Sequence, residues 1–100
     1  MDHENFLYKL ENIIESRKKS ADSSSYTAGL FASGLERMLQ KTGEESVEYI
    51  LAAMGNSREK TISQAADLFF HLLVSLSAAN ITLKDIEDEL KKRHKNSGNP

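Results

Sequence analysis

The sequence predicts an all-α domain of four helices, organised around a long helical hairpin. The only proline is Pro100, so proline bars no earlier position from a helix. Apolar residues recur at helical spacing, whereas the apolar/polar alternation that is typical of strands is nowhere sustained. With 100 residues, we expect one domain with one core rather than a multidomain enzyme.

The first helix is predicted from the apolar residues between positions 6 and 14, and it ends near the basic run at 17–19. Residues 20–25 read as a loop by composition, and the serines at its end can cap a second helix that begins near residue 26 or 27. This second helix is expected to be long and to run to Met54, because the next stop signal is the segment 55–57.

A third helix is predicted to follow at once, since Asn56 and Glu59 have the spacing of a capping box. It runs to about residue 79. The second and third helices should therefore form an antiparallel hairpin across a short turn.

The last helix is expected to be short. Asn80 ends the third helix, and Thr82 with Asp85 three residues later opens the fourth. We place the domain at residues 1–95 and a disordered tail at 96–100.

Composition excludes several classes of function. The chain has 13 basic and 15 acidic residues, a net charge of −2, which disfavours binding to nucleic acid or to an anionic membrane. The absence of cysteine excludes disulfides, cysteine-bound zinc, iron–sulfur clusters and thiol catalysis. The N-terminus lacks a basic stretch followed by an apolar run, and polar residues interrupt the apolar stretch at 69–79. We therefore expect a soluble, unprocessed, cytoplasmic protein.

Carboxylates lie on the face of the predicted second helix that is otherwise apolar. At about 100° per residue, Glu45 is only about 20° around the helix from Met38. Lys41 and Glu48 flank the same stripe, and Glu44 can approach it from the side. Because a buried, unpaired carboxylate is costly, Glu45 needs a partner cation.

The predicted third helix carries a stripe of polar residues on an otherwise apolar surface. Residues 68–74 are apolar almost all the way round, so we infer that a second subunit covers one face. Gln64, Asp67 and His71 share one face and would form an acidic pocket opposite the carboxylates of the second helix. His71 has two interpretations, a hydrogen-bonded core histidine or a ligand, of which the first is the more common.

Clustered oxygen ligands without cysteine suit Mg²⁺ or Mn²⁺ more than zinc. Because Mg²⁺ commonly bridges carboxylates to phosphate oxygens, the pattern favours a phosphate substrate. The alternative is that these charges form a solvated helix face.

Four segments carry a family resemblance: SSYTA at 24–28, KTGEESVE at 41–48, AADLFFHLLV at 65–74 and LKKRH at 90–94. In this order, spread over residues 6–94, they resemble phosphoribosyl-ATP pyrophosphohydrolase of histidine biosynthesis, a member of the MazG-like all-α pyrophosphohydrolases. The resemblance implies a MazG-like fold assembled as a dimeric helix bundle. It also implies Mg²⁺-dependent hydrolysis of 1-(5-phosphoribosyl)-ATP to 1-(5-phosphoribosyl)-AMP and pyrophosphate, by a homodimer.

The resemblance also assigns roles to the carboxylates. Glu45, Glu48 and Asp67 match the metal ligands of the family. Gln64 stands where the family has glutamate, and its amide oxygen can still bind a hard cation but brings no charge. Glu44 matches a further family glutamate and is the candidate for orienting or deprotonating the attacking water.

A second set of residues are candidates for binding the phosphates of the substrate. Ser25, Tyr26 and Thr27 lie at the start of a helix, where free amides favour anions. Lys41 and Arg93 are further phosphate-binding candidates. Tyr26 can equally be a core aromatic, and Arg93 can equally belong to a solvated helix C-terminus.

Two rival functions stay open from the sequence. The first is a MazG-like house-cleaning enzyme that hydrolyses other nucleoside triphosphates with the same pocket. The second is a non-catalytic helical interaction module in which Gln64 marks a decayed metal site. Family members are fused in many organisms to the cyclohydrolase of the next step, a zinc enzyme with cysteine ligands. Because this chain has no cysteine, we expect that enzyme on a separate protein.

Overall fold

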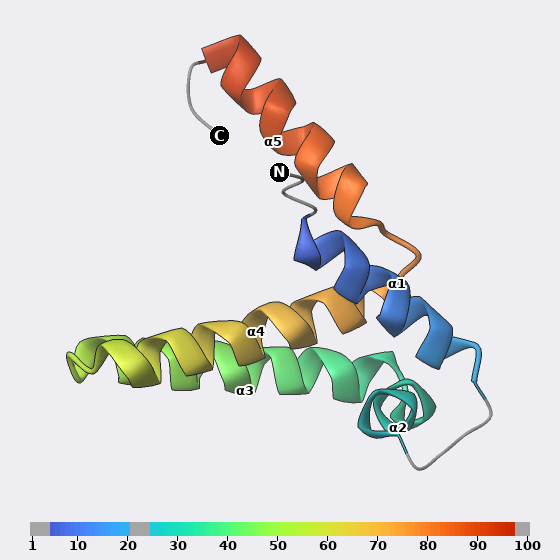
Figure 1. Ribbon diagram of the computed structural model, residues 1–100, viewed down its shortest axis with the longest axis horizontal. Coiled ribbons are helices and arrows are strands. Elements are labelled where there is room, and N and C mark those ends of the chain that lie inside the picture. Colours follow the sequence, from blue (N-terminus) through green and yellow to red (C-terminus); the bar gives the residue numbers. More distant parts are fainter. Residues whose placement is uncertain (1–4, 21–24, 98–100) are drawn as a thin grey trace.

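The computed structural model describes residues 5–20 and 25–97, and these residues form helices and connections without a β-strand. The expected all-α fold is confirmed. Five helices are present rather than four: α1 (Phe6–Lys18), α2 (Tyr26–Ser33), α3 (Leu35–Met54), α4 (Arg58–Ala78) and α5 (Leu83–Ser97) (Figure 1).

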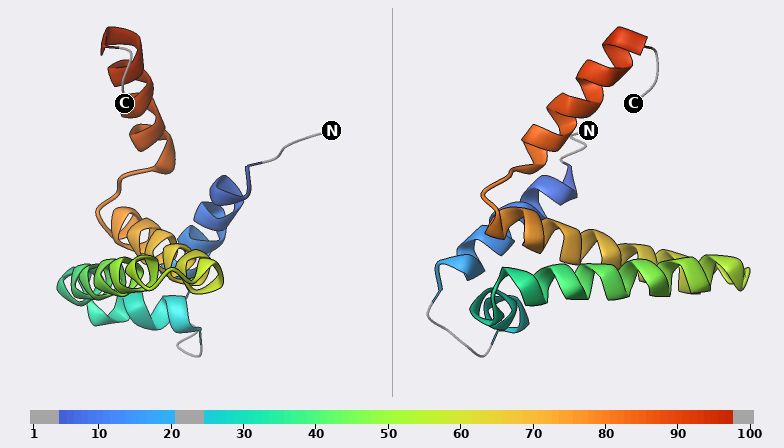
Figure 2. Two further views of the ribbon diagram at one scale, coloured as in Figure 1. Left: turned by 90° about the vertical axis from the view of Figure 1, so that its left-hand side faces the viewer. Right: turned by 180° about the vertical axis from the view of Figure 1, so that it is seen from behind.

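The prediction of one helix from 26 to 54 is wrong, because the chain breaks at Gly34. This residue has a φ of 94°, which lies in the left-handed region that glycine adopts far more readily than other residues. Its N–H donates to the carbonyl of Phe31 at the end of α2, and its own carbonyl accepts from the N–H of Met38 in α3. The break lets α2 lie across the end of α3 (Figures 1 and 2).

The antiparallel hairpin is confirmed. Helices α3 and α4 lie side by side along their length and are joined by the turn at 55–57 (Figure 1). The predicted cap at Asn56 is wrong by one position, since the Ser57 hydroxyl accepts the N–H of Lys60 at 3.2 Å. Asn56 instead has a φ of 63°, so it makes the turn itself.

The capping box before α5 is confirmed. The Thr82 N–H donates to the Asp85 carboxylate at 2.9 Å, and the Asp85 N–H donates to the Thr82 hydroxyl at 3.1 Å. Helix α5 is longer than expected, with 15 residues, and it includes residues 96 and 97 of the predicted tail. Residues 98–100 lie outside the described residues, so the boundary between domain and tail stays a prediction.

One core joins the first four helices. Its buried members are Ile14 of α1, Leu30 of α2, Met38 of α3, and Leu73 and Val74 of α4. Polar contacts close the end of this core, where α1 crosses α4. The Ser77 hydroxyl donates to the carboxylate of Glu15, and the Lys18 ammonium donates to the Ser77 carbonyl at 2.7 Å.

Helix α5 projects away from the hairpin (Figures 1 and 2). Two hydrogen bonds attach it to α1: the Tyr8 hydroxyl donates to Glu87 at 2.8 Å, and the Leu83 N–H donates to Glu11 at 2.6 Å. An apolar groove of about 250 Å³ lies between α5 and the hairpin, and it is lined by Leu7, Phe69, Leu72, Leu73, Leu76, Leu83, Ile86 and Leu90.

Helix α4 is only partly covered. His71, Val74 and Ser75 are buried, but Phe69 is 52% exposed and Leu72 is 44% exposed. By length and composition alone, α4 would pass as a membrane span, a test that core helices also pass. The one-chain structure thus leaves an apolar face on α4 open, as the sequence predicted.

Candidate functional site

Glu45 has the partner cation that its position requires. The side chain of Glu45 is only 15% exposed, and its carboxylate lies 3.6 Å from the ammonium of Lys41, one turn earlier on α3. The Lys41 side chain is itself only 22% exposed. The pair is therefore shielded from solvent more than an ordinary surface ion pair.

Glu44 lies beside the same lysine. Its carboxylate is 3.9 Å from the Lys41 ammonium and 3.7 Å from the guanidinium of Arg37, and it accepts a hydrogen bond from the Gln40 amide at 3.3 Å. Its side chain is 49% exposed, so solvent reaches it. Lys41 thus bridges Glu44 and Glu45, and Arg37 extends the row of charges toward the start of α3.

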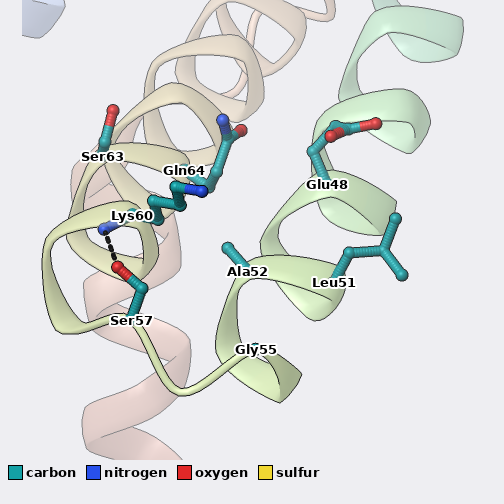
Figure 3. A pocket seen from close by; sticks show the side chains of 8 residues that line it. All are labelled: Glu48, Leu51, Ala52, Gly55, Ser57, Lys60, Ser63 and Gln64. Carbon is teal, nitrogen blue, oxygen red and sulfur yellow. Dashed lines mark hydrogen bonds between the residues drawn. The ribbon is translucent and has the colours of Figure 1, made fainter.

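A cavity of about 420 Å³ opens between α3 and α4 near their turn, lined by Glu48, Leu51, Ala52, Gly55, Ser57, Lys60, Ser63 and Gln64. Glu48 and Gln64 lie on opposite sides of it (Figure 3). The Gln64 Oε1 atom is buried and has no hydrogen-bond partner among the described residues. Because a buried acceptor without a partner is costly, this oxygen is suited to a ligand that the cavity admits.

The predicted metal ligands are only partly brought together. Glu48 and Gln64 share the cavity, whereas Glu45 pairs with Lys41 and Asp67 is exposed one turn beyond Gln64 on α4. Across the described ranges, no three acidic or histidine side chains form a cluster that would hold a metal ion. A carboxylate and an unpartnered amide oxygen nevertheless fit Mg²⁺, which takes oxygen ligands and usually retains several waters.

A second cavity, of about 390 Å³, lies where α2 begins and faces α3. It is lined by Ser25, Tyr26, Gly29, Leu30, Ser33, Arg37 and Lys41. Ser25 also caps α2, because its hydroxyl accepts the N–H of Ala28 at 3.2 Å. Three of the five predicted phosphate-binding residues, Ser25, Tyr26 and Lys41, therefore meet in one place.

His71 is a hydrogen-bonded core histidine. It is 6% exposed, its Nδ1 lies 2.8 Å from the carbonyl of Asp67, and its Nε2 lies 3.0 Å from the hydroxyl of Tyr26. Since a carbonyl can only accept, Nδ1 carries the proton, and in the neutral ring Nε2 accepts from Tyr26. The more common interpretation of His71 is confirmed.

Two predicted residues lie apart from the others. Thr27 is half-buried in the first turn of α2, and the second cavity is not lined by it. Arg93 lies on the projecting α5 (Figure 1), where its Nε donates to Glu89 at 3.0 Å. Within one chain, Arg93 is therefore separated from the residues of the hairpin.

Two basic residues that line these cavities were not predicted from the sequence. Arg37 lies one turn before Lys41 on the same face of α3, and this four-residue spacing could have identified it from the sequence. Lys60 lines the cavity that holds Glu48 and Gln64. The sequence alone does not indicate that Lys60 lines a cavity, because the cavity forms only where α4 packs on α3.

Comparison with known proteins identifies the family of this chain. The family model described as phosphoribosyl-ATP pyrophosphohydrolase matches residues 7–94. Among curated relatives, the histidine biosynthesis bifunctional protein HisIE of Campylobacter jejuni is 49% identical over 90% of this chain. The HisIE proteins of Salmonella typhi and Vibrio cholerae are 48% and 46% identical over 89% and 90% of the chain.

The chain spans only 43–44% of the length of these relatives. The family match nevertheless covers nearly all of the described residues. The resemblance to the phosphoribosyl-ATP pyrophosphohydrolase family is confirmed. The chain belongs to the phosphoribosyl-ATP pyrophosphohydrolase family.

Proposed function

We propose that this chain hydrolyses 1-(5-phosphoribosyl)-ATP to 1-(5-phosphoribosyl)-AMP and pyrophosphate with Mg²⁺ in the cytoplasm, as the second step of histidine biosynthesis. The observation that carries this proposal is the unpartnered, buried oxygen of Gln64, opposite Glu48 in the cavity between α3 and α4. That oxygen has the chemistry of a ligand for a hard cation.

Glu48 and Gln64 are the first two metal ligands in this proposal, and Glu45 and Asp67 complete the set. When bound, Mg²⁺ neutralises phosphate charge and polarises the phosphorus anhydride. For Glu45 to join the ligands, it must exchange the Lys41 ammonium for the metal ion. The exchange would leave the Glu45 carboxylate paired with a cation, as its low exposure requires.

In this proposal, residues of the second cavity and its surroundings bind the phosphates of the substrate. Ser25, Tyr26 and Lys41 line it, and Thr27 adds a hydroxyl in the first turn of α2. The free N–H groups at the start of α2 attract an anion. Arg93 can join them only from a neighbouring copy, because α5 projects away from its own hairpin (Figure 2).

Glu44 is the proposed catalytic residue. Its side chain is about half exposed, so water reaches it, and it lies beside the cations Arg37 and Lys41 on α3. Its role is to orient the attacking water and accept its proton, as a general base within hydrogen-bond reach does. Phosphate binding to Lys41 and Arg37 would release Glu44 for this role.

We further propose that the active form is a homodimer. The apolar groove between α4 and α5 and the exposed Phe69 and Leu72 form a surface that a second copy of this chain can cover. Association through this surface would also bring α5 of one copy near the hairpin of another. No nucleic acid or membrane partner is proposed.

The test is pyrophosphate release from phosphoribosyl-ATP with and without Mg²⁺, with ATP as parallel substrate. Selective, metal-dependent release supports the proposal. Equal release from ATP would identify a general MazG-like nucleoside triphosphate pyrophosphohydrolase. No release from either substrate by folded protein would favour a non-catalytic interaction module.

Two variants locate the activity in the proposed cavity. Glu48→Gln should abolish metal-dependent release, because it removes the only carboxylate among the described residues that line this cavity. Glu59→Gln is the matched control, since Glu59 is exposed in the first turn of α4 and does not line the cavity. Equal loss in both variants would contradict the assignment of the site.

A further inference from the structure

Arg37 and Lys41 form a pair of cations in one cavity. Both residues line the second cavity, and they lie one helical turn apart on α3. The Arg37 side chain is 46% exposed and the Lys41 side chain 22%, so the cavity offers one cation near solvent and one deeper in the protein. Two cations in one cavity attract a ligand with more than one negative charge.

Glu44 is the counter-ion that these two cations share. Its carboxylate lies 3.7 Å from Arg37 and 3.9 Å from Lys41. Both distances, and the 3.6 Å from Lys41 to its other partner Glu45, exceed that of a good charge-assisted hydrogen bond, so these carboxylates leave donors of both cations unsatisfied. A phosphate monoester, with two negative charges and three free oxygens, can displace such a weakly held carboxylate.

The position of this cavity distinguishes it from the proposed metal cavity. Arg37 and Glu48 are 11 residues apart on α3, a separation of about 16 Å along the helix axis. The substrate of the proposed function carries a triphosphate at one end and a phosphate monoester on the added ribose at the other. An anhydride bound at Glu48 therefore leaves the monoester to a second cation site, which begins at Lys41, beside Glu45, and extends away from the metal cavity to Arg37.

We propose that Arg37 and Lys41 bind the phosphate monoester of the phosphoribosyl group and so select phosphoribosyl-ATP over ATP. This inference rests on the proposed function for the identity of the substrate. Monoester binding replaces Glu44 at both cations. Arg37 is then a specificity-determining residue, and it couples substrate binding to the release of Glu44.

The first experiment measures binding without metal or turnover. Ribose 5-phosphate is titrated into wild-type protein, and NMR shifts of the Arg37 and Lys41 amides are followed. Arg37→Gln should weaken binding at least tenfold, and Arg37→Lys should restore part of it. Arg58→Gln is the matched control, because Arg58 begins α4 at the turn of the hairpin, whereas Arg37 lies near the start of α3, and this variant should bind as wild type does.

Glu44 variants test the displacement. Glu44→Gln should tighten the binding of ribose 5-phosphate several-fold, because the ligand no longer competes with a carboxylate. Glu36→Gln has the same change in net charge on the same helix, outside the cavity lining, and should have a much smaller effect. Equal tightening in both variants would show only a general charge effect and would overturn the displacement.

The second experiment uses catalysis. Arg37→Gln should raise KM for phosphoribosyl-ATP at least tenfold with little change in any residual hydrolysis of ATP. Unchanged KM together with unchanged ribose 5-phosphate binding would overturn the proposal while leaving the proposed hydrolysis intact. A wild-type protein that binds ribose 5-phosphate but hydrolyses nothing would instead contradict the proposed function alone.

Discussion

The Tyr26 hydroxyl lies 3.0 Å from Nε2 of His71, and this contact joins the first turn of α2 to the middle of α4. The opposite ring nitrogen donates to the Asp67 carbonyl at 2.8 Å, so the ring is held from both sides. Phe70 packs next to both rings, with centroid distances of 6.2 Å to Tyr26 and 5.2 Å to His71. One residue of the second cavity is thereby fixed by a residue on the helix that carries Gln64 and Asp67.

Tyr26→Phe should destabilise the fold. The substitution leaves Nε2 of the buried His71 without its donor, at an expected cost of about 1–3 kcal/mol. Urea denaturation of wild type and variant measures the difference. Tyr49→Phe is the control, because the Tyr49 hydroxyl has no hydrogen bond within the described part of the chain. Equal stability of Tyr26→Phe and wild type would show that the bond contributes nothing in solution.

Gln64→Glu should strengthen Mg²⁺ binding by about tenfold, because it adds a negative charge at a proposed metal ligand that lines the cavity. Calorimetric titration of metal into folded protein, without substrate, measures this change. Asn12→Asp makes the same conversion of amide to acid on α1 and should leave the affinity unaltered. Unchanged or weaker binding by Gln64→Glu would remove Gln64 from the ligand set.

Tyr8 should ionise later than an ordinary tyrosine. The hydrogen bond to Glu87 is the main cause that raises the pKa of Tyr8 from 10.0 to about 12, and desolvation and nearby carboxylates add to it. A raised folded-state pKa stabilises the protein fully below pH 10, and this contribution is lost as the pH rises through about 12. Alkaline denaturation should therefore begin with release of α5 from α1.

The tyrosinate absorbance between pH 10 and about 12 measures this effect. Tyr8→Phe should remove the ionisation step at about pH 12, whereas Tyr49→Phe should leave that step in place. An alkaline titration in which every tyrosine ionises near pH 10 would contradict the contact between Tyr8 and Glu87.

The elements that the sequence predicted best are those determined by neighbouring residues. The capping box of Thr82 and Asp85 and the turn of the hairpin involve contacts within a few positions, so local spacing identifies them. The need of Glu45 for a partner cation followed from its place on the apolar face of one helix, although the sequence did not identify Lys41 as that partner. The stripe on α4 similarly indicated that His71 would be buried.

Features that depend on packing between helices could not be predicted from the sequence. Glycine is tolerated inside helices, so Gly34 predicts a break only when the packing of α2 across α3 is known. Both Asn56 and Ser57 can cap a helix, and the backbone angle of the turn decided between them. The second cavity also required the position of α2, without which Arg37 resembles any solvated helix charge.

Leu72→Glu should convert the proposed homodimer to a monomer. Leu72 is 44% exposed on α4 and lines the apolar groove, so the charge is tolerated in one folded chain but not under a second copy. In a symmetric dimer one substitution alters two contacts, and the loss of two buried leucines raises the dissociation constant at least about a hundredfold. Sedimentation measures the assembly, and circular dichroism checks the fold. Ile13→Glu, on an exposed position of α1 outside the groove, should remain dimeric. If Leu72→Glu sediments as a dimer, a different face of the chain forms the interface.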